Sequence, residues 1–156
     1  MNIRLSEFFE EDLFLPAIQA TDKEGVLQAL VDSLVAAERI QHGDVLMEML
    51  RQRERLGSTG IGRGVAVPHG RSLAITRLTV VLGVVPDGVE FDAIDKKPVN
   101  LVFLIVAPPQ ERTNLYLPVL GKIVETVKSA KARRRILKAA DFDEVIEILE
   151  EADDGG

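Results

Sequence analysis

The sequence VNLVFLIVA at residues 99–107 sets the architecture of the whole chain. Its part from Leu101 to Ala107 is entirely apolar, but a membrane-spanning helix needs about 20 such residues. A short continuous apolar run instead predicts a β-strand buried on both faces. We therefore expect a central strand here, inside a sheet that helices cover on each side.

Two further strands are predicted N-terminal to this one. Residues 78–85, LTVVLGVV, are apolar and β-branched, and Pro86-Asp87-Gly88 predicts a turn directly after them. Residues 13–18, LFLPAI, predict a short strand at the sheet edge, where Pro16 is tolerated. The segment 91–99 between the two longer strands predicts a loop with at most a short strand.

Helical periodicity lies at both ends of the chain. Thr21-Asp22-Lys23-Glu24 matches a capping box and predicts a helix that ends near Glu38. Gly43-Asp44 predicts the start of a second helix, which ends near Gly57. Three more helices are expected at residues 120–127, 133–140 and 141–149.

These elements predict an α+β fold with three layers (α/β/α), in which helices flank both faces of one small mixed β-sheet. The strand–helix alternations are too few for a repeated βαβ fold. Residues 1–150 are expected to form a single domain. The acidic, glycine-ended segment 151–156 is expected to be a frayed tail.

Composition excludes several classes of function. The 156 residues include 19 basic and 25 acidic side chains, a net charge of −6, which argues against partners such as nucleic acid or anionic membranes. The absence of cysteine excludes thiol catalysis and iron–sulfur clusters, and two histidines are too few for a multi-histidine metal site. No signal peptide or membrane-inserted segment is visible, so we expect a cytoplasmic protein without a metal or other cofactor.

Residues 57–70, GSTGIGRGVAVPHG, hold five of the twelve glycines and end in the most informative residue, His69. Repeated glycine predicts an irregular loop whose backbone amides approach an anion closely. Pro68 stiffens the approach to an imidazole whose neutral form is a nucleophile near pH 7. The segment therefore indicates phosphate chemistry on His69. The amides expected to hold the anion are those of Gly60, Gly62 and Gly64.

Arg53 is the second candidate. It follows Met49 by four residues and Leu46 by seven, which places it on the apolar face of the second predicted helix. A guanidinium there needs an anionic partner, and a phosphoryl group on His69 would fit, with Glu54 as the alternative resting partner. Taken singly, the histidine, the arginine and the glycines each have an ordinary structural explanation. Their coincidence within seventeen positions favours a phosphate site.

Other motifs contribute less. Gly57–Gly62 has the Walker spacing, but Arg63-Gly64 replaces the required Lys-Ser/Thr. Arg133-Arg134-Arg135 predicts a solvated helix face, with docking of an acidic partner as the alternative. A partly exposed apolar surface for a partner protein is expected around the histidine from Leu46, Met49, Ile61 and Val65.

The segment Leu50–Gly70, LRQRERLGSTGIGRGVAVPHG, resembles the signature of the fructose/mannitol-type IIA domain of the bacterial phosphoenolpyruvate-dependent sugar phosphotransferase system. FDAIDKKPVNLVFLIVAP and the order of elements also resemble this family, so the match covers nearly the whole chain. As a stand-alone chain it is most similar to the nitrogen-regulatory IIA proteins.

The resemblance implies that Nε2 of His69 accepts a phosphoryl group from a phosphorylated HPr-like carrier protein. The group then passes to a IIB domain, or its presence regulates a target such as a sensor kinase or a transporter. Arg53 matches the family arginine that contacts the phosphorylated histidine, and Thr59 matches the threonine beside the site. The chain is then a phosphotransferase component rather than a stand-alone enzyme.

The sequence departs from the family at Asn114, which stands where a second histidine is expected. An asparagine donates a hydrogen bond but carries neither charge nor a transferable proton. Pro118 predicts that the following helix begins late. Two hypotheses therefore stay open: phosphoryl relay, and a regulatory binding module that His69 phosphorylation switches. A metal-independent hydrolase with His69 as general base ranks below both.

Overall fold

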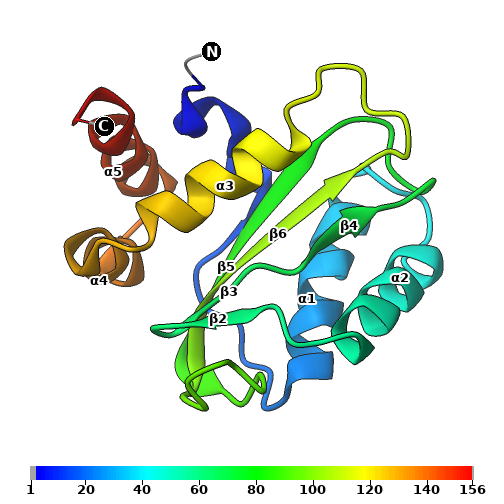
Figure 1. Ribbon diagram of the computed structural model, residues 1–156, viewed down its shortest axis with the longest axis horizontal. Helices are drawn as coiled ribbons and strands as arrows, with labels where there is room; N and C mark the ends of the chain where they lie inside the picture. Colours follow the sequence, from blue (N-terminus) through cyan, green and yellow to red (C-terminus); the bar gives the residue numbers. More distant parts are fainter. Residues whose placement is uncertain (1–2, 156) are drawn as a thin grey trace.

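A six-stranded mixed sheet forms the middle layer of the structure, a computed structural model that describes residues 3–155 (Figure 1). The strand order is β1-β5-β6-β3-β2, and β4 also pairs with β6. The strands are β1 (Phe14–Leu15), β2 (Gly60–Gly62), β3 (Val65–Ala66), β4 (His69–Arg71), β5 (Thr79–Val89) and β6 (Val99–Ala107). The predicted central strand, β6, is confirmed.

Helices cover both faces of the sheet, which confirms the predicted three-layer α+β fold (Figure 1). Those on one face are α1 (Lys23–Ala36) and α2 (Asp44–Arg55), and those on the other are α3 (Tyr116–Thr126), α4 (Ala130–Lys138) and α5 (Phe142–Gly155). Two short 3₁₀ turns at the N-terminal end are Leu5–Phe8 and Glu11–Leu13.

Strand β6 is apolar throughout because each of its faces meets a different helical layer. Leu101, Phe103 and Ile105 belong to the core that packs against α3, α4 and α5. Val102 and Leu104 belong to the core that packs against α1 and α2. A strand buried on both faces needs no alternation of polar residues.

Both β3 and β4 run parallel to the same edge of β6, one after the other, while β5 is antiparallel on the opposite edge. Val65 lies opposite Leu101, and His69 lies opposite Ile105. Four residues along a strand span about 13 Å. The register therefore separates the β2–β3 hairpin from the histidine.

The prediction that residues 57–70 form an irregular loop is wrong, because β2, β3 and β4 all come from this segment. Its glycines are used at the hairpin turn, where Gly62, Arg63 and Gly64 have φ values of 94°, 60° and 79°. Glycine adopts such values without strain. The pairing of β3 and β4 with β6 supplies the hydrogen bonds that a loop would lack.

Two other local predictions differ from the structure. Strand β5 continues to Val89 through the predicted turn at Pro86-Asp87-Gly88, with a shift of register between Val84 and Val89. The irregular register accommodates the proline, which has no N–H to donate. Helix α1 is capped by Asp22, whose carboxylate accepts a hydrogen bond from the Gly25 amide at 2.7 Å, and not by Thr21.

The start of α3 and the end of α5 also differ from the predictions. Helix α3 begins at Tyr116, since Pro118 lies in the first turn, where a helix needs no N–H donor. Helix α5 continues through residues 151–155, where a frayed tail was predicted. The Asp153 carboxylate anchors it by accepting hydrogen bonds from the amides of Leu5 at 2.7 Å and Ser6 at 3.1 Å. Gly156 lies outside the described residues.

Within residues 3–155, no helix has both the length and the apolar character needed to cross a bilayer.

Candidate functional site

His69 is the first residue of β4 and is half-buried. Its Nδ1 lies 2.7 Å from the carbonyl oxygen of Val67. Because a carbonyl oxygen only accepts, Nδ1 carries the proton in this contact. In the neutral ring, Nε2 is then left with its lone pair, which is the form a nucleophile needs.

The neighbouring glycine fixes the direction in which His69 points. A Cβ atom on Gly70 would lie 2.4 Å from Sδ of Met49 in α2. The side-chain position of Gly70 therefore faces α2. Successive side chains of a strand point to opposite faces. His69 consequently faces the layer that contains α3.

On that side His69 meets Tyr116, the first residue of α3. The two ring centroids are 6.5 Å apart, and the guanidinium carbon of Arg71 lies 4.6 Å from the centroid of the Tyr116 ring. Nη1 of Arg71 also donates to the carbonyl oxygen of Pro108 at 3.1 Å. Sequence reasoning missed Arg71 and Tyr116. The signal that was available for Arg71 is its spacing, since residues i and i+2 of a strand share a face.

Tyr116 keeps its hydroxyl proton in this setting. Burial raises the pKa of Tyr116, while the positive charges of Arg71 and Arg53 oppose the shift. A charge shifts a pKa only at short range, so the charges of both arginines lie close enough to act on the Tyr116 ring, which neighbours the ring of His69. The surroundings of the histidine are therefore positive.

Arg53 is half-buried in the last turn of α2, and its Nη1 donates to the carbonyl oxygen of Gly57 at 2.8 Å. Glu54 was predicted as its alternative partner, and this is wrong. Glu54 pairs instead with Lys23, at 2.9 Å between Nζ and Oε1. Arg53 therefore has no carboxylate on its guanidinium in the part of the chain described, residues 3–155, and it remains available to an anion.

Glu54 and Thr59 form a buried network that supports the start of β2. Oε2 of Glu54 accepts from the Thr59 hydroxyl at 2.5 Å, and its Oε1 accepts from the Thr59 amide at 3.1 Å. Thr59 is 3% exposed, and its carbonyl oxygen accepts from the Val67 amide at 2.9 Å. Both residues thus act on His69 through the backbone of Val67 and not by contact.

The structure does not bring the predicted anion-binding glycines to His69. The Gly60 amide donates to Oγ of Ser58 at 3.0 Å. A Cβ on Gly62 would lie 3.4 Å from Asp95, and one on Gly64 would lie 3.6 Å from Asn100. These glycines belong to the hairpin, which pairs with the opposite end of β6.

Asn114 lies in the exposed turn before α3, with a φ of 56°. Among the described residues, its side chain makes no hydrogen bond to His69. The turn is held by Glu111, whose carboxylate accepts from the amides of Thr113 at 2.7 Å and Leu115 at 3.0 Å. Burial alone would raise the pKa of Glu111, but the hydrogen bond from the Thr113 hydroxyl and those from the backbone amides together lower it.

Of the four side chains predicted for a partly exposed apolar surface, Met49 and Ile61 are half-buried. Leu46 and Val65 are at most 1% exposed and belong to the core. Large exposed apolar side chains near the site residues include Leu73, two positions after Arg71, Leu117, directly after Tyr116, and Leu56, three positions after Arg53, which are 87%, 64% and 86% exposed. Within residues 3–155, no group of three or more His, Asp or Glu side chains gathers as a metal site.

Comparison with known proteins places this geometry in a family. The family model described as "Phosphoenolpyruvate-dependent sugar phosphotransferase system, EIIA 2" matches residues 7–152. A fructose-specific EIIA component from Haloferax volcanii is 31% identical over 129 residues, which are 83% of each chain. A nitrogen regulatory protein from Klebsiella oxytoca is 29% identical over 151 residues, 96% of this chain and 92% of that one.

Other relatives are longer. The chain matches a fructose-specific EIIABC component from Bacillus subtilis with 27% identity and spans only 24% of its length. Among solved structures, the nitrogen regulatory protein IIA-Ntr from Neisseria meningitidis has a TM-score of 0.84 and 30% identity, covering 93% of this chain and 98% of that one. These findings confirm the predicted resemblance, and the chain belongs to the EIIA 2 family of the phosphoenolpyruvate-dependent sugar phosphotransferase system.

Proposed function

We propose that the chain, acting as one domain in the cytoplasm, is a phosphoryl carrier whose His69 accepts phosphate on Nε2 from a phosphorylated HPr-like protein. The observation that carries this proposal is the 2.7 Å contact between Nδ1 of His69 and the carbonyl oxygen of Val67. It assigns the proton to one ring nitrogen and the lone pair to the other. Membership of the EIIA 2 family supports the same role.

The transfer is a single in-line displacement at phosphorus. The lone pair of Nε2 forms the new N–P bond while the P–N bond of the donor phosphohistidine breaks, and its electron pair returns to the donor ring. The proton stays on Nδ1 throughout. The Val67 carbonyl stabilises the positive charge that develops on the His69 ring during the attack.

Side chains neutralise the charge of the phosphoryl oxygens in this proposal. Arg53 and Arg71 are the two cations that act electrostatically on Tyr116, whose ring neighbours that of His69. A guanidinium binds phosphate with two parallel hydrogen bonds. The Tyr116 hydroxyl, which keeps its proton, is a third donor in this proposal.

Onward transfer to a IIB domain is the next step of the proposal. One structural neighbour is the Escherichia coli mannitol IIA, solved in complex with its phosphorylated IIB, with a TM-score of 0.75 and 22% identity. We extend that partner class to this chain. Leu73 and Leu117 are the exposed apolar side chains that a docking protein would cover.

A regulatory binding module is the second candidate function. In it, phosphate stays on His69 and changes the affinity of the protein for a target such as a sensor kinase or transporter. The observation that favours this candidate is Asn114, which is exposed and cannot hold a proton for onward transfer. A doubly charged phosphate beside Leu73 and Leu117 would repel an apolar or acidic partner.

Phosphorylation in a reconstituted system tests the proposal. The protein is incubated with phosphoenolpyruvate, enzyme I and HPr, and the phosphate is mapped by mass spectrometry at neutral to alkaline pH. We expect one phosphate on His69 and none on the His69→Ala variant. The His42→Ala variant should carry as much phosphate as the native chain. An unlabelled His69 in the presence of a competent carrier refutes the proposal.

A chase separates the two candidate functions. Addition of a IIB domain removes the phosphate from His69 within seconds to minutes if the chain is a relay. Retention of the phosphate, together with a change in affinity for a regulatory target, supports the binding module. Arg53→Gln is expected to slow labelling at least tenfold with the fold intact, because the phosphate loses one bidentate partner.

A further inference from the structure

A row of cations on α4 has no role in the site described above. Residues 128–138 hold six basic and no acidic side chains, in a chain whose net charge is −6. Three of the six have partners in the structure. Arg133 donates to the carbonyl of Val127 at 2.7 Å, Arg135 pairs with Glu151, and Lys128 pairs with Glu125 at 3.1 Å.

The other three, Lys131, Arg134 and Lys138, make no ion pair with any residue in the range 3–155. All three are exposed. Their spacing of i, i+3 and i+7 places them on one stripe of the helix, about 10 Å long. We name this row the α4 stripe. Like charges at these spacings repel one another, so the stripe costs stability unless an anion covers it.

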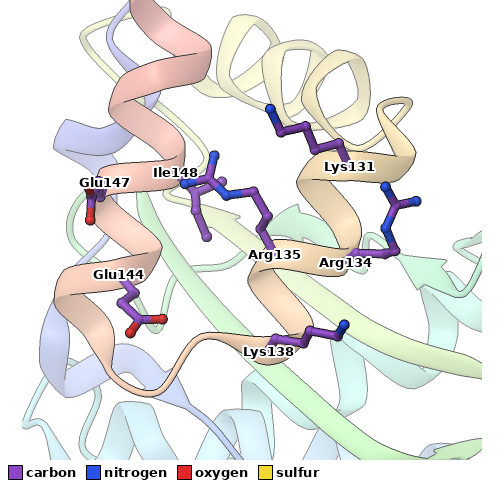
Figure 2. A pocket seen from close by; sticks show the side chains of 7 residues that line it. All are labelled: Lys131, Arg134, Arg135, Lys138, Glu144, Glu147 and Ile148. Carbon is purple, nitrogen blue, oxygen red and sulfur yellow. The ribbon is translucent and has the colours of Figure 1, made fainter.

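The stripe borders a groove of about 410 Å³ between α4 and α5, lined by its three cations, by Arg135 and, from α5, by Glu144, Glu147 and Ile148. Figure 2 shows Arg135 directed toward Ile148, whereas Arg134 and Lys138 project from the other side of α4. Arg134 and Lys138, which have no carboxylate partner, thus face away from α5, whereas Lys131 extends on the α5 side of the helix, as Arg135 does.

The α4 stripe lies far from His69. The N-terminal end of α3 is Tyr116, beside the histidine, and the C-terminal end of α3 leads into α4. The eleven residues of α3 span about 16 Å. A partner on the stripe would therefore leave the Nε2 side of His69 open to a second protein.

We propose that the α4 stripe is a docking surface for an acidic segment of a partner protein. The charges lie in a row and do not converge, which suits an extended or helical segment better than a compact anion such as free phosphate. Nucleic acid and anionic membranes need many more cations than three, and the −6 net charge repels them.

Binding of a defined acidic probe tests the proposal. The probe is a fluorescein-labelled peptide of twelve alternating Glu and Ala residues, titrated with the full chain at 50 mM and 200 mM salt. The variant Arg134→Glu/Lys138→Glu removes two stripe cations and is compared with Lys96→Glu/Lys97→Glu, which changes net charge equally on exposed residues outside the stripe. Circular dichroism verifies that both variants fold.

We expect the stripe variant to weaken peptide binding at least tenfold and the control variant to weaken it less than twofold. Amide chemical shifts of the unmodified chain should change along α4 on titration, and His69→Ala should bind the peptide as the native chain does. Equal losses in the two variants, shifts elsewhere, or tighter binding of a 20-base-pair DNA duplex or phosphatidylserine vesicles than of the peptide overturn the proposal. None of these outcomes depends on phosphorylation.

Discussion

Replacing Glu54 with glutamine tests whether this carboxylate holds the start of β2 in place. The Glu54 side chain is 8% exposed, and it binds Nζ of Lys23 at 2.9 Å. The same carboxylate accepts the hydroxyl and amide hydrogen bonds of Thr59 at 2.5 and 3.1 Å. Glutamine keeps the volume of the side chain and removes its charge, so the change isolates electrostatics from packing.

The magnitude follows from the burial of the two partners. Breaking a fully buried ion pair costs about 3–5 kcal/mol, because one charge is left without compensation. Lys23 is 20% exposed, so water reaches its ammonium and reduces that cost. We expect the free energy of unfolding of Glu54→Gln to fall by about 2 kcal/mol, which lowers the Tm of a chain of this length by about 4–8 °C.

Urea unfolding followed by circular dichroism measures the change. The matched control is Glu48→Gln on the same helix, since Glu48 is 51% exposed and its oxygens lie 3.6 and 3.9 Å from Arg51 and Arg55. Exposed pairs contribute less than about 1 kcal/mol, so the control should lose about 0.5 kcal/mol at most. Equal losses in the two variants would refute the assignment of Glu54 as a buried anchor.

Three further variants extend the argument. Gly70→Ala places a Cβ 2.4 Å from Sδ of Met49, so we expect a loss of about 1–3 kcal/mol in urea unfolding and slower phosphorylation, because β4 or the methionine must shift. Asp153→Asn weakens the hydrogen bonds that tie Leu5 and Ser6 to α5, and we expect a loss of about 1–2 kcal/mol. The third variant is Glu10→Gln. The hydrogen bond from Arg39 lowers the pKa of Glu10 from its ordinary 4.5, against the opposing effect of burial. The loss of stability in this variant should therefore be complete above pH 4.5 and disappear as the pH falls through the lowered pKa.

Each of these three predictions has an outcome that would contradict it. Gly70→Ala with native stability and native labelling would mean that Met49 moves freely. Asp154→Asn is the control for Asp153, since within residues 3–155 the Asp154 side chain bonds only the exposed Arg4, and an equal loss would remove the anchoring role. A Glu10→Gln difference that persists unchanged at pH 2 would show that it does not arise from the charge of Glu10.

The sequence predicted the layers correctly because their signals are local. Residues 101–107 are an unbroken apolar run, and such a run is typical of a strand that is covered on both faces. Helical spacing of apolar residues likewise predicted α1, α2 and the three C-terminal helices. The ends of elements were less accurate, as at α1, where Asp22 and not Thr21 supplies the cap.

The glycine-rich segment was misread because its structure depends on a distant partner. Nothing within residues 57–70 indicates that Val65 will pair with Leu101 and His69 with Ile105. Glycine frequency alone predicts chain flexibility, but here it serves a hairpin turn and one close helix contact, at Gly70. The amides expected to bind an anion therefore lie at the wrong end of the strand.

The candidate site could be read from the sequence only in part, for a related reason. Residue type and spacing within one stretch of chain point to His69 and Arg53, and their role stays a prediction. Tyr116 was not, because its contact with the histidine exists only after α3 has packed on the sheet. Arg71 was missed because residues 57–70 were predicted to form a loop. In a loop, a spacing of two residues does not show that two side chains point to the same side.

The position of His69 in a strand bears on how the proposed phosphoryl transfer would be catalysed. The Val67 amide donates to the Thr59 carbonyl oxygen at 2.9 Å, and the Pro68 carbonyl oxygen accepts from the Ile105 amide at 3.0 Å, so the backbone before His69 is held from both sides. The backbone thus holds the Val67 carbonyl that orients the ring and keeps the proton on Nδ1. In the proposed transfer, the charge of the phosphoryl oxygens is neutralised by Arg53, Arg71 and groups that the docking protein brings. The rate of transfer should accordingly respond more to these arginines than to any glycine of the hairpin.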